Sequence, residues 1–484
     1  GVIENHGLFE IGVCLPQSEK TKQFIAFAVK NLEVQVRMQI MPDGVHWEQS
    51  PMYHNEVLHC LLDVILLAKR NDIALPDVIL RQTEKMAMAD VAWLKPDHHI
   101  VMMGDSDDVD VRDRISVAAY LFLNPVLRFG GFDRLDYESI WDLGMKAGEE
   151  YAGMERRKPD FTSLFLEHSG NTYFRSDWSE RANFLHLHSG TMGAGHGHSD
   201  KLHIDLVVNG EDVLMDGGRY TYVSGPKRFS YKDPSGHNTI TVDDLPFTVC
   251  KDSWECSKLS QPVKENFRCT KLAEFAQAGQ LGYMDLPSGV YVNRKVVYIK
   301  PDLYVLADEM YTGDRHTYQQ YFHFNNHGTV TQNAPGEKKF PCVAYRGKMA
   351  EADFYFVSAQ VKAELKSGHI ARHYNVEEEN TVCKVTKQGE GFTSLITVID
   401  AQPGRPLSIE KLPVRSALKQ TDYPETMAEA LKITAGEKEY VVILCHQEVN
   451  SPTDLVEADG CMGYGNVIVF DKAGDVLVGD VLNW

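Results

Sequence analysis

The stretch LHIDLVVNGEDVLM, residues 202–215, decides the fold of the second part of this chain. Apolar residues occupy every second position along 202–208, which is the period of a strand with one buried face. Asn209-Gly210 is a dipeptide that strongly favours a two-residue hairpin turn, and the chain is apolar again at 213–215. The stretch therefore predicts an antiparallel hairpin.

The period of two continues after this hairpin. Many strands joined by short turns, with hardly a helix between them, imply a large antiparallel β-sandwich. We expect the sandwich over 159–400 and a further β-sheet of the same region over 401–484. The other strands are expected at 239–242, 290–299, 303–307, 318–324, 354–357, 395–399, 440–444, 467–470 and 476–482.

Before about residue 160 the apolar spacing is helical instead. Ser18 can cap one helix, and Ser50-Pro51 has the signature of a cap followed by proline at the first helical position. A third helix is expected over 76–94, and a fourth ends before Asn124-Pro125. Helices that alternate with polar loops in this way are typical of successive helical hairpins around a toroid.

The segment RRKP, residues 156–159, is the best linker candidate between the two regions. The predicted fold class is therefore multidomain α + β: a partial (α/α) toroid over 1–158, followed by the sandwich. At 484 residues the chain is long enough for two or three domains.

Composition and charge narrow the possible partners. A formal net charge of -19 argues against a general nucleic-acid-binding protein, which needs a basic face. An acidic substrate is not excluded, because a local cluster of cations can line one cleft. No apolar run approaches the roughly 20 residues of a membrane-spanning helix. The nine cysteines form no CxxC pair and favour neither a disulfide framework nor a thiolate zinc site.

The densest polar cluster is GAGHGHSD, residues 193–200. Glycine between His196 and His198 lets the backbone bend, so both rings can face one cavity. The hairpin at Asn209-Gly210 folds Asp216 back toward this loop, and His237 follows downstream. Two imidazoles and a carboxylate with room for a fourth ligand favour zinc. The alternative is that these are turn residues and hydrogen-bonded histidines of a β-domain.

Two further clusters lie in the helical region. Asn5-His6 places an amide next to an imidazole, and both can donate hydrogen bonds to one carboxylate; the alternative is an ordinary helix-capping loop. In the run DGVHWEQSPMY, residues 43–53, Tyr53 lies in the first turn of an expected helix, so its hydroxyl should lie near the loop. Trp47 could stack on a sugar ring, or it could be a packing residue.

These motifs occur together and in order with MGDSDD, residues 103–108, and with His237-Asn238-Thr239. Over about residues 5 to 245 the chain resembles the heparinase II/III family and its relatives, the oligo-alginate lyases. The resemblance implies an (α/α) toroid joined to an antiparallel β-sandwich, with the substrate cleft between them. Because the family toroid needs more helices than 1–155 can supply, we expect that part of it precedes Gly1.

The resemblance also implies a reaction, β-elimination at a uronic acid of an acidic polysaccharide, and roles for individual residues. Asn5 with His6 matches the position that neutralises the sugar carboxylate. Tyr53 matches the residue that acts as general base, general acid or both, and His196 matches a second proton-transfer position. His198, Asp216 and His237 match the metal ligands, for which zinc is expected and calcium is the alternative.

Three cations lie in segments that could meet sulfate or carboxylate groups of the substrate: Arg175, Lys227 and Arg228. Solvated surface cations are the alternative. Heparan sulfate is the first candidate substrate, with alginate and hyaluronan-like polymers as alternatives. The resemblance implies a bacterial, periplasmic protein, whereas free cysteines and the polar start of the chain are compatible with the cytoplasm.

Two other functions fit parts of the same pattern. Zinc with an open position commonly activates water, so a zinc hydrolase is one; no HExxH motif occurs in the sequence, and a tyrosine-centred site with an asparagine fits elimination better. The other is a non-catalytic carbohydrate-binding protein that retains the metal.

Overall fold

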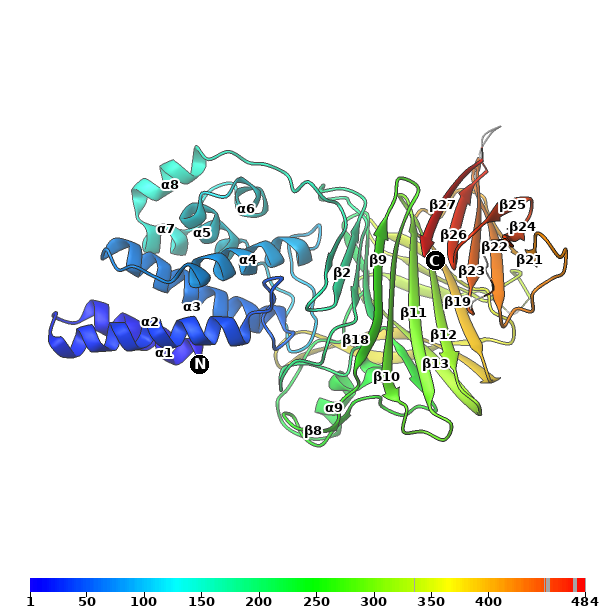
Figure 1. Ribbon diagram of the computed structural model, residues 1–484, viewed down its shortest axis with the longest axis horizontal. Coiled ribbons are helices and arrows are strands. Elements are labelled where there is room, and N and C mark those ends of the chain that lie inside the picture. Colours follow the sequence, from blue (N-terminus) through cyan, green and yellow to red (C-terminus); the bar gives the residue numbers. More distant parts are fainter. Residues whose placement is uncertain (335, 448, 450–452, 473–476, 484) are drawn as a thin grey trace.

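The computed structural model describes residues 1–334, 336–447, 449, 453–472 and 477–483. Figure 1 shows helices at one end of an elongated molecule and sheets over the rest. The helices of the first part are α1 (Val2–Cys14), α2 (Glu19–Gln39), α3 (Pro51–Arg70), α4 (Asp77–Trp93), α5 (Arg112–Phe122), α6 (Pro125–Gly130), α7 (Tyr137–Leu143) and α8 (Met145–Ala152).

Strands follow from residue 164 onward, interrupted in the described chain by α9 (Pro226–Lys232) and the short 3-10 helix η1 (Pro234–Gly236). The first, nine-stranded sheet contains β1 (Leu164–Leu166), β2 (Asn171–Arg175), β3 (Phe184–His188), β4 (His203–Val208), β5 (Glu211–Leu214), β6 (Ile240–Val242), β13 (Arg315–Phe324), β17 (Lys362–His373) and β18 (Val376–Glu390).

The second, eight-stranded sheet contains β9 (Pro262–Cys269), β10 (Ala273–Tyr283), β11 (Val290–Ile299), β12 (Leu303–Tyr311), β14 (Thr329–Gln332), β15 (Cys342–Arg346), β16 (Glu351–Phe356) and β19 (Thr393–Asp400). Three smaller sheets complete the fold: β20 (Leu407–Leu412), β22 (Ala428–Ala435), β23 (Lys438–Cys445), β26 (Val467–Asp471) and β27 (Val478–Asn483); then β21 (Arg415–Ser416), β24 (Val456–Ala458) and β25 (Cys461–Gly463); and the pair β7 (Val249–Cys250) and β8 (Cys256–Lys258).

The sheets stack in layers because each buries its apolar face against the next. Leu206 of the nine-stranded sheet and Val296 of the eight-stranded sheet belong to one buried cluster, which is the core of the sandwich. The other face of the eight-stranded sheet packs through Val305 against Leu431 of the five-stranded sheet. The expected antiparallel sandwich is confirmed, and the strands described after residue 400 lie in the smaller sheets.

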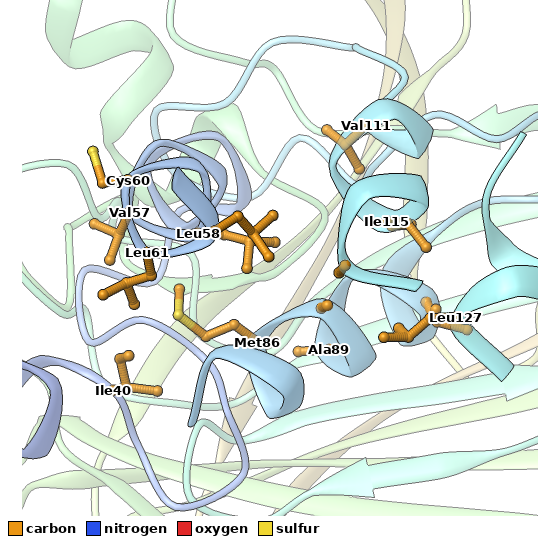
Figure 2. Packing of buried hydrophobic residues seen from close by; sticks show 14 of the residues in the cluster. Ile40, Val57, Leu58, Cys60, Leu61, Met86, Ala89, Val111, Ile115 and Leu127 are labelled. Atoms are coloured by element: carbon orange, nitrogen blue, oxygen red, sulfur yellow. The ribbon is translucent and has the colours of Figure 1, made fainter. Parts of the chain in front are cut away.

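The helices form hairpins that pack side by side, as expected for part of a toroid. Figure 2 shows Leu58 and Leu61 of α3 facing Met86 of α4, with Ile115 of α5 and Leu127 of α6 nearby. All five side chains are buried in one cluster. That cluster also takes in side chains of β2, β3 and β4, so the helices and the nine-stranded sheet share a hydrophobic core. Our division at residues 158 and 400 stays a prediction.

Local signals set several of these boundaries. Ser18 caps α2, with its side chain accepting a hydrogen bond from the Thr21 backbone N–H at 3.2 Å. The turn between β4 and β5 has positive φ at both Asn209 (49°) and Gly210 (82°), as a type I′ hairpin turn requires. Most of the expected strands are found with shifted ends, while Val476 lies outside the described residues.

Helix α3 begins at Pro51, as the sequence predicts, but Ser106 and not Ser50 accepts the hydrogen bond at its N-terminus. The Ser50 hydroxyl does not cap the helix and instead pairs with the Ser106 hydroxyl at 2.9 Å. Ser106 then accepts a hydrogen bond from the Met52 backbone N–H at 3.1 Å. The loop 103–108 therefore holds the first turn of α3, which carries Tyr53.

Candidate active site and metal centre

Tyr53 and His196 meet at the junction of the helices and the sandwich. Their rings are stacked, with centroids 3.5 Å apart. The Tyr53 hydroxyl lies 2.9 Å from the hydroxyl of Tyr222, a residue in the loop that precedes α9. The structure thus brings together two residues that the sequence singled out and adds a second tyrosine.

Arg219 sets the direction of the hydrogen bond between the two hydroxyl groups. Its Nη1 donates to the Tyr222 oxygen at 2.7 Å, while its Nε and Nη2 bind both carboxylate oxygens of Asp107. Because Tyr222 accepts from Arg219, its own proton is available for the Tyr53 oxygen. Burial, the nearby Asp105 carboxylate and the hydrogen bond to Tyr53 raise the pKa of Tyr222 well above its usual value, so Tyr222 keeps that proton.

Asp105 is the centre of the buried charge network behind Tyr53. Arg228 binds both of its oxygens, at 2.6 and 2.8 Å. His196 Nδ1 lies 3.2 Å from one oxygen, and His198 Nε2 lies 2.9 Å from the other. Burial alone would raise the pKa of Asp105, but hydrogen bonds from the two histidines and from Arg228 hold it well below its usual range. Asp105 is therefore ionised and orients both histidines.

The loop that carries Asp105 needs glycine at position 104. Gly104 has φ of +61°, and a Cβ there would lie 2.9 Å from the carbonyl oxygens of both Gln49 and His196. The Asp105 backbone N–H donates to the His196 carbonyl at 2.8 Å. The histidine loop (residues 192–200) therefore packs directly on the loop 103–108. This contact explains how His196 and His198 can share the carboxylate of the distant residue Asp105.

The expected metal ligands also converge. Candidate ligand atoms of His198, Asp216 and His237 all lie within 4.8 Å of one another, and all three side chains are buried. His198 Nδ1 and His237 Nε2 have no hydrogen-bond partner among the described residues. His237 Nδ1 lies 2.7 Å from Asp216. Two unpartnered imidazole nitrogens beside a carboxylate fit a borderline-soft divalent ion.

Neighbouring side chains fix this group in place. The Asn238 amide donates to the carbonyls of Ile204 and Met215, and the Thr239 hydroxyl donates to the carbonyl of Lys201. These bonds tie the segment after His237 to the two strands of the 202–215 hairpin. The His-Asn-Thr motif thus supplies one candidate ligand and two anchors.

Asn5 and His6 make other contacts in this structure. His6 Nε2 is 3.5 Å from Asp63 of α3, and the neighbouring Asp63 carboxylate and Cys60 thiol raise the pKa of His6 to about 10. Asp63 follows Tyr53 by ten residues, about 15 Å of helix at 1.5 Å per residue. The Asn5 amide donates to the Gly1 carbonyl at 2.8 Å. Neither side chain contacts Tyr53 in the described part of the chain, so their carboxylate-neutralising role stays a prediction.

Two of the expected substrate-binding cations require correction. Arg228 has no exposed surface, and its guanidinium is ion-paired with Asp105. It therefore holds Asp105 in place and is not positioned to contact substrate. Arg175 is 4% exposed, stacks between Trp178 and Phe184, and donates to the Leu94 carbonyl. It lines a separate cavity of about 600 Å³ whose walls contain neither Tyr53 nor His196. Lys227 is ion-paired with Glu377.

Of the exposed aromatic residues of the site, the sequence predicts only Trp47. Trp47 is 42% exposed, which agrees with a stacking role. Trp254 is 50% exposed, meets the His196 ring edge-on at 5.3 Å and stacks on Tyr222 at 5.2 Å. Tyr374 stacks on the Tyr222 ring at 5.4 Å. Tyr222, Trp254 and Tyr374 have no local motif that marks them in the sequence, and only the fold brings them together.

Comparisons with known proteins identify the family of this chain. The family model described as "Heparinase II/III-like, C-terminal" matches residues 158–406, just over half of the chain, and the model "Heparinase II/III N-terminus" matches residues 2–125. The chain belongs to the heparinase II/III family. Both matched segments contribute to the site, since Tyr53 lies in the first and His196 and Tyr222 lie in the second.

Individual members of the family are more distant. A heparin-sulfate lyase of Pedobacter heparinus is 26% identical over 271 residues, which are 52% of this chain and 38% of that protein. A heparin-sulfate lyase of Bacteroides thetaiotaomicron is 22% identical over 329 residues, 64% of this chain and 43% of that protein. The chain thus spans about two fifths of the length of these curated relatives.

Solved structures show the same fold. The crystal structure of a heparan sulfate lyase from Pedobacter heparinus matches 93% of this chain and 66% of that chain, with a TM-score of 0.73 and 18% identity. A heparinase III structure matches 92% of this chain and 67% of that chain, with a TM-score of 0.73 and 16% identity. The partial toroid followed by an antiparallel sandwich is confirmed as the fold class.

Proposed function

We propose that this chain is the catalytic part of a bacterial polysaccharide lyase that cleaves a uronic-acid-containing glycosaminoglycan by β-elimination. Heparan sulfate or a heparin-like polymer is the first candidate substrate, because the curated relatives are named heparin-sulfate lyases. The single observation that carries the proposal is the hydroxyl pair of Tyr53 and Tyr222, 2.9 Å apart and backed by Arg219.

Elimination requires a base at C5 of the uronic acid and an acid at the departing O4. Arg219 donates to Tyr222, and Tyr222 in turn donates to Tyr53, so the Tyr53 oxygen is an acceptor in this arrangement. We assign proton abstraction to Tyr53 and the return of a proton to O4 to the pair of hydroxyls.

His196 is the second proton-transfer group. Asp105 binds its Nδ1, which leaves Nε2 available, and the ring is partly exposed. An imidazole held in this way by a carboxylate can accept or donate a proton at its other nitrogen. We propose that Asn5 and His6 approach the uronate carboxylate, as the family resemblance implies, with Trp47 and Trp254 as exposed stacking surfaces for the sugar rings.

We propose zinc as the ion held by His198, Asp216 and His237. Two nitrogen donors favour zinc over calcium, which takes oxygen ligands. When bound, the ion supplies a fixed positive charge that organises the histidine loop. Water activation is not needed, since elimination consumes no water.

The test is a panel of heparan sulfate, heparin, hyaluronan and alginate, each mixed with the protein. A rise in ultraviolet absorbance from an unsaturated uronate product identifies elimination and ranks the substrates. New reducing ends without that absorbance would indicate the zinc hydrolase instead. Binding of a polymer without either product would indicate the non-catalytic carbohydrate-binding protein. Either of these two results overturns the proposal.

None of the helices in the described part of the chain has the length and apolar character needed to cross a bilayer. We propose an acidic polysaccharide or oligosaccharide as the partner of this chain and no nucleic acid, in line with the net charge of -19. The periplasm remains our first proposal for its compartment, with the cytoplasm as the alternative.

A further inference from the structure

The hairpin of β7 and β8 forms one wall of the candidate active site. Its tip carries Trp254, whose ring contacts His196 and Tyr222. The Ser253 hydroxyl donates to the Tyr222 backbone carbonyl at 2.8 Å. Lys232 Nζ donates both to the Ser253 carbonyl at 3.0 Å and to the Gly195 carbonyl at 2.6 Å. The hairpin is therefore joined to both loops that position the reacting groups.

Two cysteines face each other across this hairpin. Cys250 and Cys256 are paired residues of the antiparallel strands, and their Sγ atoms are 3.2 Å apart. Cys256 Sγ also lies 3.6 Å from Met192 Sδ in the histidine loop. Both cysteines are free thiols in this structure and partly exposed, so a small oxidant can reach them.

We propose that Cys250 and Cys256 are a redox modification site: they form a reversible disulfide that links β7 to β8 and so rigidifies the hairpin tip that carries Trp254. The two sulfur atoms are already neighbours on facing strands, so closing the bond needs a shift of about 1 Å toward the normal S–S length of roughly 2.05 Å.

The chemistry of the pair suits thiol–disulfide exchange. The hydrogen bond from Cys250, together with the Lys232 ammonium, outweighs burial and lowers the pKa of Cys256 to about 7. The same hydrogen bond and burial raise the pKa of Cys250. Cys256 is therefore the attacking thiolate, and Cys250 is the resolving thiol.

The reaction is balanced with a small-molecule disulfide such as glutathione disulfide as oxidant. The Cys256 thiolate attacks one sulfur and releases the first glutathione thiolate, which takes up a proton. Cys250 then loses its proton and attacks Cys256 Sγ, which releases the second glutathione. Two protein thiols are oxidised to one disulfide, and one glutathione disulfide is reduced to two thiols.

The first experiment is peptide mapping of the intact chain after equilibration with glutathione disulfide, alkylation of free thiols, and trypsin digestion without reduction. Cleavage after Lys232, Lys251 and Lys258 places the two cysteines on separate peptides, 233–251 and 252–258. We expect these peptides to remain joined and to separate on reduction. Cys250→Ser should abolish the joined species, whereas Cys14→Ser, which removes an exposed thiol, should leave it unchanged.

Alkylation of both cysteines after equilibration, or separate glutathione adducts on each, overturns the proposal. This result is independent of the lyase function, because it requires no substrate. The second readout rests on the proposed function: fixing the Trp254 wall should lower KM by about two- to tenfold with kcat unchanged, the usual effect of immobilising one side chain in advance of binding. Unchanged KM in a protein shown to be oxidised would overturn the part of the proposal that concerns the active site.

Discussion

The phenol ring of Tyr53 lies on the imidazole of His196, with 3.5 Å between the centroids and 17° between the ring planes. One residue comes from the first turn of a helix and the other from a loop of the sandwich, so the contact spans the two parts of the molecule. In the proposed mechanism a sugar meets the Tyr53 hydroxyl and the imidazole edge, because each ring covers a face of the other. Proton transfer at these atoms can be tested one group at a time.

Tyr53→Phe keeps the ring and its stacking on His196 but removes the proton carrier. We expect the variant to fold normally, to bind substrate, and to lose on the order of 10²–10⁴ in turnover, the usual contribution of a positioned acid–base group. The measurement is the rate of ultraviolet absorbance increase at saturating substrate. Tyr137→Phe, at an exposed tyrosine of α7, is the matched control and should keep full activity. Near wild-type turnover for Tyr53→Phe would shift the role of base to His196.

Tyr222→Phe removes the hydroxyl that links Arg219 to Tyr53. We expect kcat to fall by about 10- to 100-fold with a smaller change in KM, because a charge-assisted hydrogen bond contributes about 1.5–3 kcal/mol. Steady-state kinetics of the variant give both constants. Tyr374→Phe is the control, since that ring stacks on Tyr222 but its hydroxyl has no assigned role. An equal fall in kcat in both variants would indicate that Tyr222 contributes only packing.

The metal proposal predicts one divalent ion per chain in protein purified without chelator, measured by elemental analysis. His198→Ala should remove the ion and lower the thermal midpoint, because the binding free energy of the ion contributes to folding. A chelator should lower the midpoint of the unaltered protein to a similar degree. His369→Ala, at a partly exposed histidine of β17, should change neither. If His198→Ala still binds one metal ion per chain, this ligand set is wrong.

Stability should fall in acid through Glu309, a buried carboxylate between the eight-stranded and five-stranded sheets. Although burial raises its pKa, Lys295 and His446 outweigh burial and lower the pKa from 4.5 to about 2. A depressed folded-state pKa means that the stabilisation is complete above pH 4.5 and is lost as the pH falls toward 2. By linkage the loss is on the order of 3 kcal/mol.

Urea unfolding between pH 6 and about pH 2 measures this dependence. Glu309→Gln should be less stable at pH 6, because Lys295 is then buried without its charge partner, and its stability should change less with pH. Glu351→Gln, at an exposed glutamate of β16, should follow the unaltered protein. Parallel curves for Glu309→Gln and the unaltered protein would contradict the assignment.

The sequence predicts those parts of the molecule that depend on local pattern. The Asn209-Gly210 turn needs positive φ at two positions, and its hairpin brings Asp216 back to within 4.8 Å of His198, as the sequence predicts. The candidate metal ligands can therefore be grouped by the hairpin that folds them together. Arg228 and Arg175 show the limit of such reasoning, because the sequence gives a charge without its partner. Each guanidinium donates a hydrogen bond to a residue more than 80 positions away.

Asp105 is the clearest residue that pattern alone does not explain. It stands in the run 103–108, yet nothing local indicates that its carboxylate binds Arg228 and two histidines. That arrangement depends on the close approach of Gly104 to the histidine loop, a contact between segments about 90 residues apart. Long-range loop contacts of this kind follow from the tertiary fold and not from the period of the sequence.

The contact between the Tyr53 and Tyr222 hydroxyls joins residues 169 positions apart, and this separation has a consequence for protein synthesis. The ribosome completes the helix of Tyr53 first, and at about 5–20 residues per second the segment with Tyr222 follows roughly 10–30 s later. During that interval the helices expose the surface that later contacts the nine-stranded sheet. The pair of hydroxyls that carries the proposed function therefore forms only after the segment with Tyr222 has been synthesised and folded, so the candidate site is completed late.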